Sequence, residues 1–302
     1  MTKISVAILT YNEEVNIKAC LESVSWADEV ILVDEKSGDA TVKIAKKYTS
    51  KIFLVNHGSA SGLTHDTMFH KHKQIALEKC TGDWIFQIDA DERISPELAK
   101  EIKEAVDSPI YNGFQVPRRN IIFGKWIEHT GWYPDYQVKL FRKGKGRYAC
   151  KTVHEQIEID GEIGVLTQDL IHSHYISVSQ FIDRMNRYTT NDANFILGKN
   201  ESVSWTDAVK FPVDEFLKRF FFLEGYRDGL HGLVLSGFQA LNRLVVFAKI
   251  WEKQGFWKKE NPEFREEFLK TVKRSASDWA YCVAQTEKND FKKLIYKATK
   301  KI

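Results

Sequence analysis

The chain has 302 residues, 43% of them hydrophobic and 28% charged, which is enough for one large domain or two smaller ones. Its formal net charge of +3 is too small to indicate nucleic-acid binding. The four cysteines are widely spaced and form no C-x-x-C pair, which excludes a thiolate zinc site and a disulfide framework. We therefore expect free thiols, a cytoplasmic location and no nucleic-acid partner.

The first 100 residues alternate between apolar runs typical of buried strands and patterns typical of helices. Strands are expected over residues 4–10, 29–34, 51–55 and 84–89, and helices over 15–24, 40–48 and 71–80 and from Pro96. Ser95 followed by Pro96 is a typical helix start. This alternation predicts an α/β fold with a mostly parallel sheet flanked by helices.

The alternation of strand and helix patterns ends near residue 110. Short aromatic segments separated by glycines follow it, and they favour antiparallel strands and loops. After residue 176 the pattern becomes helical. We therefore expect a first domain over residues 1–176, divided into halves 1–109 and 110–176, and a helical region over residues 177–302.

Polar residues follow the first two strands, where open α/β sheets bind their ligands. Thr10, Asn12 and Glu13 come at the end of the first strand, and Asp34 ends the second. These side chains can bind a nucleotide, although capping of the next helix explains Asn12 equally well. The chain contains neither G-x-G-x-x-G nor a P-loop motif, which argues against a dinucleotide cofactor.

Asp89 and Asp91 follow the last strand of this first series. Two carboxylates separated by one residue can converge on a divalent cation, which prefers oxygen ligands and substrate phosphates. A solvated acidic turn is the alternative.

Four motifs in this order resemble those of family 2 glycosyltransferases, inverting enzymes of the GT-A fold: T-Y-N-E-E, V-D-E-x-S-G-D-A-T, K-Q-x-A-L and D-A-D-E. The resemblance extends over residues 3–175. It is greatest with the branch that contains the lipopolysaccharide-core β-1,4-glucosyltransferases, through A-L-E-K-x-T-G-D-W, G-W-Y-P-D and V-H-E.

The resemblance implies a GT-A catalytic domain whose first half binds a nucleotide sugar and whose second half binds the acceptor. The residues implied for the donor pocket are Thr10, Asn12, Glu13, Asp34, Lys73 and Asp89. Asp91 would ligate Mg²⁺ or Mn²⁺, with Asp89 as a second ligand. Such an ion stabilises the charge that grows on the leaving nucleoside diphosphate.

An inverting displacement needs a base that takes the proton of the acceptor hydroxyl. Glu155 and Asp135 are the two candidates, and a third outcome is that neither serves. His154 either completes the metal shell or supports Glu155 structurally.

Histidines at positions 57, 65, 70 and 72 lack the spacing of a zinc motif, and we expect residues 57–72 to be a loop over the donor. The N-terminus enters a strand pattern directly, so no signal peptide is expected. The longest uncharged stretch, residues 229–242, is shorter than the ~18–20 apolar residues of a spanning helix, so no transmembrane segment is expected.

The helical region mixes aromatic residues with lysine and arginine over residues 213–252, which favours a peripheral contact with the membrane. Residues 291–302 add five lysines and no acidic residue. Packing on the catalytic core or on another subunit of a homo-oligomer is the alternative.

We therefore expect a hexosyltransferase on the inner face of the membrane. Its donor would be a UDP-hexose, glucose by resemblance, and its acceptor a membrane-borne glycan such as lipopolysaccharide core or a lipid-linked sugar. A nucleotidyltransferase and a catalytically inactive nucleotide-sugar-binding scaffold are the competing hypotheses. The former would usually carry a glycine- and lysine-rich loop, which residues 9–16 lack.

Overall fold

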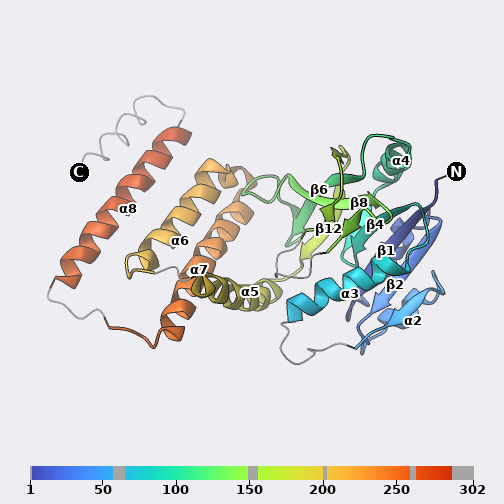
Figure 1. Cartoon of the computed structure of the whole chain (residues 1–302). Helices are drawn as coiled ribbons and strands as arrows, with labels where there is room; N and C mark the ends of the chain where they lie inside the picture. Colours follow the sequence, from blue (N-terminus) through green and yellow to red (C-terminus); the bar gives the residue numbers. More distant parts are fainter. Residues whose placement is uncertain (1, 57–64, 149–155, 200–202, 259–262, 288–302) are drawn as a thin grey trace. The chain divides into compact units, whose positions relative to one another are not determined.

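The computed structural model describes residues 2–56, 65–148, 156–199, 203–258 and 263–287, with only the backbone described at 65–69 and Thr286 (Figure 1). The chain folds as two compact units. Unit 1 comprises Met1–Ile121 and Tyr133–His174, and unit 2 comprises Ile122–Trp132 and Tyr175–Ile302. The change of unit at Tyr175 lies close to the expected boundary at residue 176, whereas the excursion at 122–132 has no counterpart in the expected linear division.

Unit 1 is built around a sheet whose central strands are parallel and buried. Its strands are β1 (Ile4–Thr10), β2 (Glu29–Asp34), β3 (Ile52–Leu54), β4 (Trp84–Asp89), β5 (Glu92–Ile94), β6 (Gly113–Ile122), β8 (Asp135–Arg142), β11 (Ile163–Val165) and β12 (Leu170–Tyr175). The two-residue strand β7 (Lys125–Trp126) belongs to unit 2. A separate hairpin pairs β9 (Gly146–Arg147) with β10 (Glu158–Ile159). Along the main path the order is β3-β2-β1-β4-β8-β6-β12-β5.

The direction of the strands changes at β4. β3, β2, β1 and β4 are parallel, and β8 is antiparallel to both β4 and β6. The parallel register pairs Thr10 with Asp34 and Leu9 with Asp89, so the ends of β1, β2 and β4 lie at one edge of the sheet. This is the edge at which open α/β sheets bind ligands.

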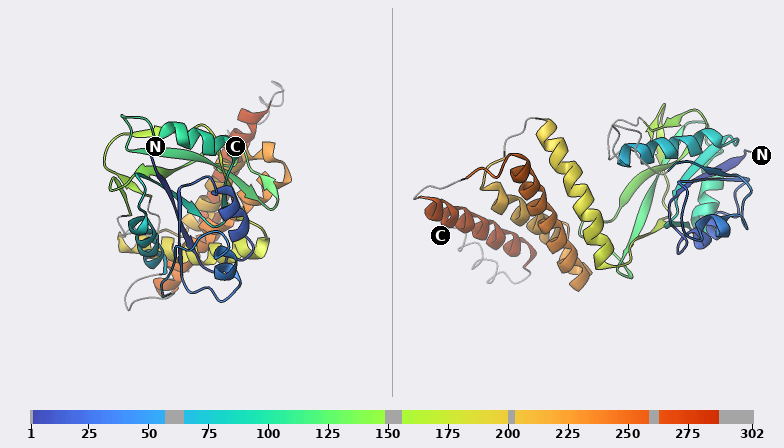
Figure 2. Two further views of the ribbon diagram at one scale, coloured as in Figure 1. Left: turned by 90° about the vertical axis from the view of Figure 1, so that its right-hand side faces the viewer. Right: turned by 90° about the horizontal axis from the view of Figure 1, so that it is seen from below.

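The side chains of β1 alternate between two apolar cores. Ile4, Val6 and Ile8 pack on one face with α1 (Ile17–Ser23) and α4 (Pro96–Ala105). Ala7 and Leu9 pack on the other face with α3 (His65–Lys79), which Figure 2 shows in cyan along the sheet. The short α2 (Thr41–Ala45) adds Ala45 to the first core. Burial on both faces explains why these strands are continuous apolar runs.

Two sequence expectations for unit 1 are wrong. The segment expected as a loop over residues 57–72 is helical from His65, and residues 57–64 lie outside the described structure. Its first turns are polar and carry no apolar periodicity, but once Ala76, Leu77 and Cys80 are packed on the sheet, each further helical residue adds a hydrogen bond. β5 was not among the expected strands, because its three residues, E-R-I, include only one apolar side chain and so form no apolar run.

Unit 2 is mainly helical. Its helices are α5 (Val178–Gly198), α6 (Asp207–Leu217), the π-helix η1 (Lys218–Phe222), the 3₁₀-helix η2 (Gly225–Asp228), α7 (Leu230–Lys253) and α8 (Phe264–Thr286). α5 and α6 both pack along α7. The helical pattern expected over 213–252 is broken at Glu224 and Gly229, whose positive φ values of 53° and 66° end one helix and start the next.

Among the described residues, α7 is the one helix that is both long and apolar enough to span a membrane. It has 24 residues, and its most apolar 18-residue window has a mean hydropathy of 1.4 with 28% of that window buried. By length and composition it is able to cross a membrane, and the core helix of a soluble protein meets the same two criteria. The expectation of no transmembrane segment, which rested on the shorter uncharged stretch, is therefore not supported by this helix.

Candidate active site

Asp34 organises the loop after β2. Its carboxylate accepts hydrogen bonds from Thr10 Oγ1 at 2.9 Å, Ser37 N at 2.8 Å and Ser37 Oγ at 2.6 Å, and the side chain is fully buried. A carboxylate has about four acceptor positions, so one further donor can still bind. Asp34 therefore holds the ends of two neighbouring strands together at the ligand-binding edge of the sheet.

Asn12 and Glu13 form the opposite side of the same loop pair. Asn12 has a positive φ of 54°, donates its backbone N–H to Ser37 Oγ at 2.8 Å and accepts from Gly38 N at 2.9 Å. Glu13 accepts from Asn16 Nδ2 at 2.9 Å and donates its N–H to Thr41 Oγ1 at 2.8 Å. α1 begins at Ile17, so Asn12 does not cap it; it joins two loops instead.

Asp89 lies between two lysines. Lys73 Nζ, from α3, is 2.6 Å from Asp89 Oδ1, and Lys139 Nζ, from β8, is 3.3 Å from Asp89 Oδ2. Burial by itself would raise the pKa of Asp89, but the ammonium groups of Lys139 and Lys73 hold that pKa well below its usual range. The side chain is therefore an ionised carboxylate whose charge is already compensated by protein cations.

Lys139 connects Asp89 to a fully buried glutamate. Its Nζ is 2.8 Å from Glu92 Oε2 and 3.2 Å from Gln87 Oε1, and Glu92 also accepts from the backbone N–H of Asp89 at 2.9 Å. Arg118 Nη1 is 3.5 Å from the other carboxylate oxygen of this glutamate, Glu92 Oε1. Sequence reasoning missed Lys139, Glu92 and Arg118.

Asp91 faces a histidine on β12. Asp91 Oδ2 is 3.6 Å from His172 Nε2, and the two side chains are 14% and 7% exposed. His172 Nδ1 is 2.7 Å from Asn120 Oδ1, so in the tautomer that donates to Asn120 the Nε2 lone pair points toward Asp91. A carboxylate with a hydrogen-bonded imidazole is a donor set that suits a divalent cation.

No three His, Cys, Asp or Glu side chains in the described ranges are close enough together to form a complete metal site. His154, the predicted histidine ligand, lies outside these ranges, as does Glu155. Asp91 and His172 can therefore supply two protein ligands, and substrate phosphates would have to supply others.

Asp135, the second predicted base, is tied to the same region by Arg118. It accepts from Arg118 Nε at 2.9 Å and also contacts Nη2, while Gln137 Nε2 donates at 2.9 Å and Asn120 Nδ2 at 3.4 Å. Burial would raise the pKa of Asp135, but the Arg118 guanidinium and these hydrogen bonds lower it. A lowered pKa reduces the ability of a carboxylate to accept a proton from a hydroxyl.

These contacts form one connected network among residues of α3, β4, β5, β6, β8 and β12 and of the turn that carries Asp91. It runs through Asp91, His172, Asn120, Asp135, Arg118, Glu92, Lys139, Asp89 and Lys73. Alternation along β8 was an available signal, because Asp135, Gln137 and Lys139 occupy every second position between apolar residues.

The structure therefore defines an α/β enzyme fold with a polar, charged site at the carboxyl ends of its parallel strands. The model described as glycosyl transferase family 2 matches residues 5–159, just over half of the chain. This chain belongs to glycosyltransferase family 2, which confirms the expected family, the GT-A fold and the glycosyltransferase class of enzyme.

Several known proteins are similar to it. The lipopolysaccharide core biosynthesis glycosyltransferase LpsC of Rhizobium meliloti is 28% identical over 85% of this chain and 95% of LpsC. An uncharacterized glycosyltransferase of Rickettsia typhi is 28% identical over 83% of this chain and 88% of its own length. The solved structure of residues 1–349 of S. aureus TarS with UDP is 18% identical, with a TM-score of 0.42 over 86% of this chain and 94% of that chain.

Proposed function

We propose that this enzyme transfers a hexose, glucose, from a UDP-sugar to a membrane-borne glycan such as lipopolysaccharide core or a lipid-linked sugar. The main support is the charged network of the site. It connects Asp89 and Asp91, the two aspartates predicted to bind the donor and the metal, to lysine and histidine side chains. The similarity to a lipopolysaccharide core glycosyltransferase along most of the chain supports the acceptor class.

The donor would bind at the ends of β1, β2 and β4. Thr10, Asn12, Glu13 and Asp34 would form the wall for the nucleoside, with Asp34 accepting a hydrogen bond from the base or ribose. Lys73 is held at this edge by its ion pair with Asp89, so its ammonium can attract the diphosphate.

Asp91 and His172 would hold Mg²⁺ or Mn²⁺, and His154 is a further candidate ligand. When bound, the ion offsets the negative charge that develops on the leaving UDP. Asp89 is a weaker candidate than Asp91 because Lys73 and Lys139 already compensate its charge. We therefore propose that Asp89 either contacts the ribose of the donor or serves as a second carboxylate ligand of the metal ion.

For the base we propose Glu155 rather than Asp135. The Arg118 guanidinium pairs with Asp135 and lowers its pKa, and it would compete with an acceptor hydroxyl for the same carboxylate oxygen. Asp135 would then act as a positioning residue that aligns Arg118 and Asn120. Glu155 would accept the proton while the acceptor oxygen attacks the anomeric carbon and UDP leaves.

The test is a donor screen that measures UDP release with Mn²⁺ and a glycan acceptor. Asp91→Ala and Glu155→Gln should each reduce turnover by about 100-fold or more, the range typical of metal-site and general-base residues. Glu104→Gln on the exposed face of α4 is the matched control and should retain wild-type turnover. Full turnover of Asp91→Ala would refute the metal site, and full turnover of Glu155→Gln would transfer the role of base to Asp135.

The same assay separates the competing functions. A nucleotidyltransferase would release pyrophosphate from a nucleoside triphosphate and no UDP from a UDP-sugar. An inactive scaffold would bind UDP-sugar without releasing UDP in any variant.

We also propose that unit 2 attaches the enzyme to the inner face of the membrane, although contact with a second subunit is the alternative. The basic segment at residues 291–302 lies outside the described structure. The apolar surface of α7 supports the proposal, since Leu230, Leu233, Leu241 and Leu244 are all at least 40% exposed.

A further inference from the structure

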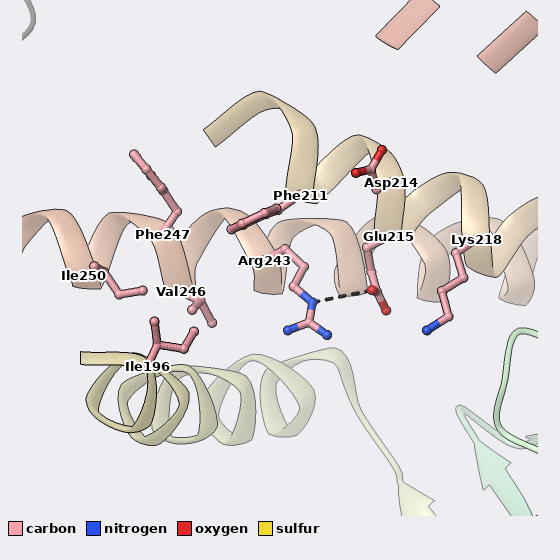
Figure 3. A pocket seen from close by; sticks show the side chains of 9 residues that line it. All are labelled: Ile196, Phe211, Asp214, Glu215, Lys218, Arg243, Val246, Phe247 and Ile250. Atoms are coloured by element: carbon pink, nitrogen blue, oxygen red, sulfur yellow. Dashed lines mark hydrogen bonds and ion pairs between the residues drawn. The ribbon is translucent and has the colours of Figure 1, made fainter. Parts of the chain in front are cut away.

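Unit 2 contains an apolar cavity of about 340 Å³ among α5, α6 and α7 (Figure 3). Val246, Phe247 and Ile250 of α7 are among its lining residues, and each is less than 9% exposed. Ile196 of α5 and Phe211 of α6 line its sides. The cavity is at the lower end of the range of about 300–1,000 Å³ found for small-molecule sites.

One side of the cavity carries cations. Figure 3 shows Arg243, Glu215 and Lys218 in a row, with the Asp214 carboxylate pointing in the opposite direction. Glu215 accepts a hydrogen bond from Arg219 Nε at 2.6 Å, and Arg243 Nε is more distant, at 3.5 Å. Arg219 and Arg243 therefore both contact this carboxylate, and Lys218 lies beside it in the lining of the cavity.

Glu215 is already satisfied by Arg219. Burial would raise the pKa of Glu215, but the neighbouring Arg219, Arg243 and Lys218 lower it, so the carboxylate is charged and neutralises one cation. Lys218 forms no ion pair with any carboxylate of the described residues. Arg243 and Lys218 are consequently left with donors that an anion could use.

The backbone changes its winding at this point. Lys218 is the first residue of η1, a π-helical turn that directly continues α6. π-turns interrupt the regular i→i+4 hydrogen bonding and occur frequently at functional sites. This observation is independent of the charges and of the cavity.

We propose that the cavity binds one alkyl chain of an anionic membrane lipid, whose headgroup pairs with Lys218 and Arg243. The apolar lining matches a hydrocarbon chain, and Lys218 and Arg243, whose donors Glu215 does not take up, match a phosphate at its end. The space is too small for a helix of a second copy or partner, which is about 10–12 Å across with its side chains. The proposal rests on the membrane attachment proposed above and assigns to it a specific lipid site.

The probe is decyl phosphate below its micelle concentration, titrated into the full chain by isothermal calorimetry. Inorganic phosphate and decyl maltoside supply the headgroup alone and the chain alone. We expect saturable one-to-one binding of decyl phosphate, and much weaker binding of the other two. Lys218→Gln and Arg243→Gln should each weaken binding by about tenfold, equivalent to about 1.4 kcal/mol.

Val246→Trp should abolish binding by filling the cavity, and Ile196→Phe provides a second, less buried way to fill it. Lys253→Gln, at the end of α7 and outside the cavity, is the matched control and should bind as the wild type does. In flotation assays, vesicles of phosphatidylglycerol should retain more wild-type protein than vesicles of phosphatidylcholine, and Arg243→Gln should reduce that difference.

The proposal is overturned if decyl phosphate does not bind, if both cavity-filling variants bind it like the wild type, or if decyl maltoside binds equally well. UDP release in the same preparations keeps the two proposals separate. If UDP is released but decyl phosphate does not bind, only the proposed lipid site is refuted. Binding without UDP release under any donor overturns the transferase function and leaves the lipid site standing.

Discussion

Replacing Lys139 with methionine tests whether the charged network stabilises unit 1. Lys139 is 5% exposed, and its Nζ lies within 3.3 Å of oxygens of Glu92, Gln87 and Asp89. Methionine keeps most of the length of the side chain and removes only the ammonium. The expected effect therefore comes from charge and hydrogen bonding rather than from a cavity.

The magnitude follows from the partners that remain. Removal of one member of a buried ion pair generally costs about 3–5 kcal/mol, because the other charge stays buried without compensation. Here Asp89 keeps Lys73 at 2.6 Å, and Glu92 keeps Arg118 at 3.5 Å. We therefore expect a loss of about 2–3 kcal/mol in the free energy of unfolding of unit 1.

Scanning calorimetry of the full chain measures this loss. For a unit of this size it corresponds to a fall of about 4–12 °C in the transition of unit 1. Lys145→Met is the matched control, because Lys145 pairs with Asp160 at 2.6 Å where both side chains are exposed. Exposed ion pairs contribute little to the free energy of unfolding, so the transition midpoint of the Lys145→Met control should equal that of the wild type. Equal midpoints for the two variants would refute the role of Lys139.

Three further predictions concern glycines and pH. Gly232→Ala should destabilise unit 2 by about 3 kcal/mol or more, because an added Cβ would lie 1.7 Å from the Gly225 carbonyl oxygen. Gly237→Ala in the same helix meets nothing within 4 Å and should instead stabilise it by up to about 1 kcal/mol in urea unfolding; a loss of stability there would contradict the open space. Burial opposes ionisation of Glu29, but its hydrogen bonds lower its pKa from 4.5 to about 2. Its contribution is complete above the unfolded pKa and is lost as pH falls from 4.5 toward 2, so Glu29→Gln should flatten the stability profile over that interval.

The parallel half of the fold was accessible from sequence. The expected strands at residues 4–10, 29–34 and 84–89 coincide with β1, β2 and β4, because each is a run of apolar residues buried on both faces. The start of α3 was missed because its first turns are polar and are held by packing further along the helix.

The site was accessible only in part. Asp34, Asp89 and Asp91 stand out because each ends or directly follows an apolar strand. Their partners do not, because Lys139 and His172 are more than 45 residues away along the chain from the aspartates that they face. The site roles stay predictions: donor binding, the metal ligands and the base. They concern Thr10, Asn12, Glu13, Asp34, Lys73, Asp89, Asp91, His154, Glu155 and Asp135. The proposed assay tests Asp91 and Glu155 directly.

The sequence by itself determined the alternation of strand and helix, the family and the location of the D-A-D motif, because these depend on local patterns of a few residues. The tertiary structure decided how that motif is charged. Only the strand order β4-β8-β6-β12-β5 brings Lys139, Arg118 and His172 to Asp89 and Asp91. The two aspartates therefore differ in their charge partners. Lys73 and Lys139 compensate the charge of Asp89, whereas Asp91 faces the imidazole of His172.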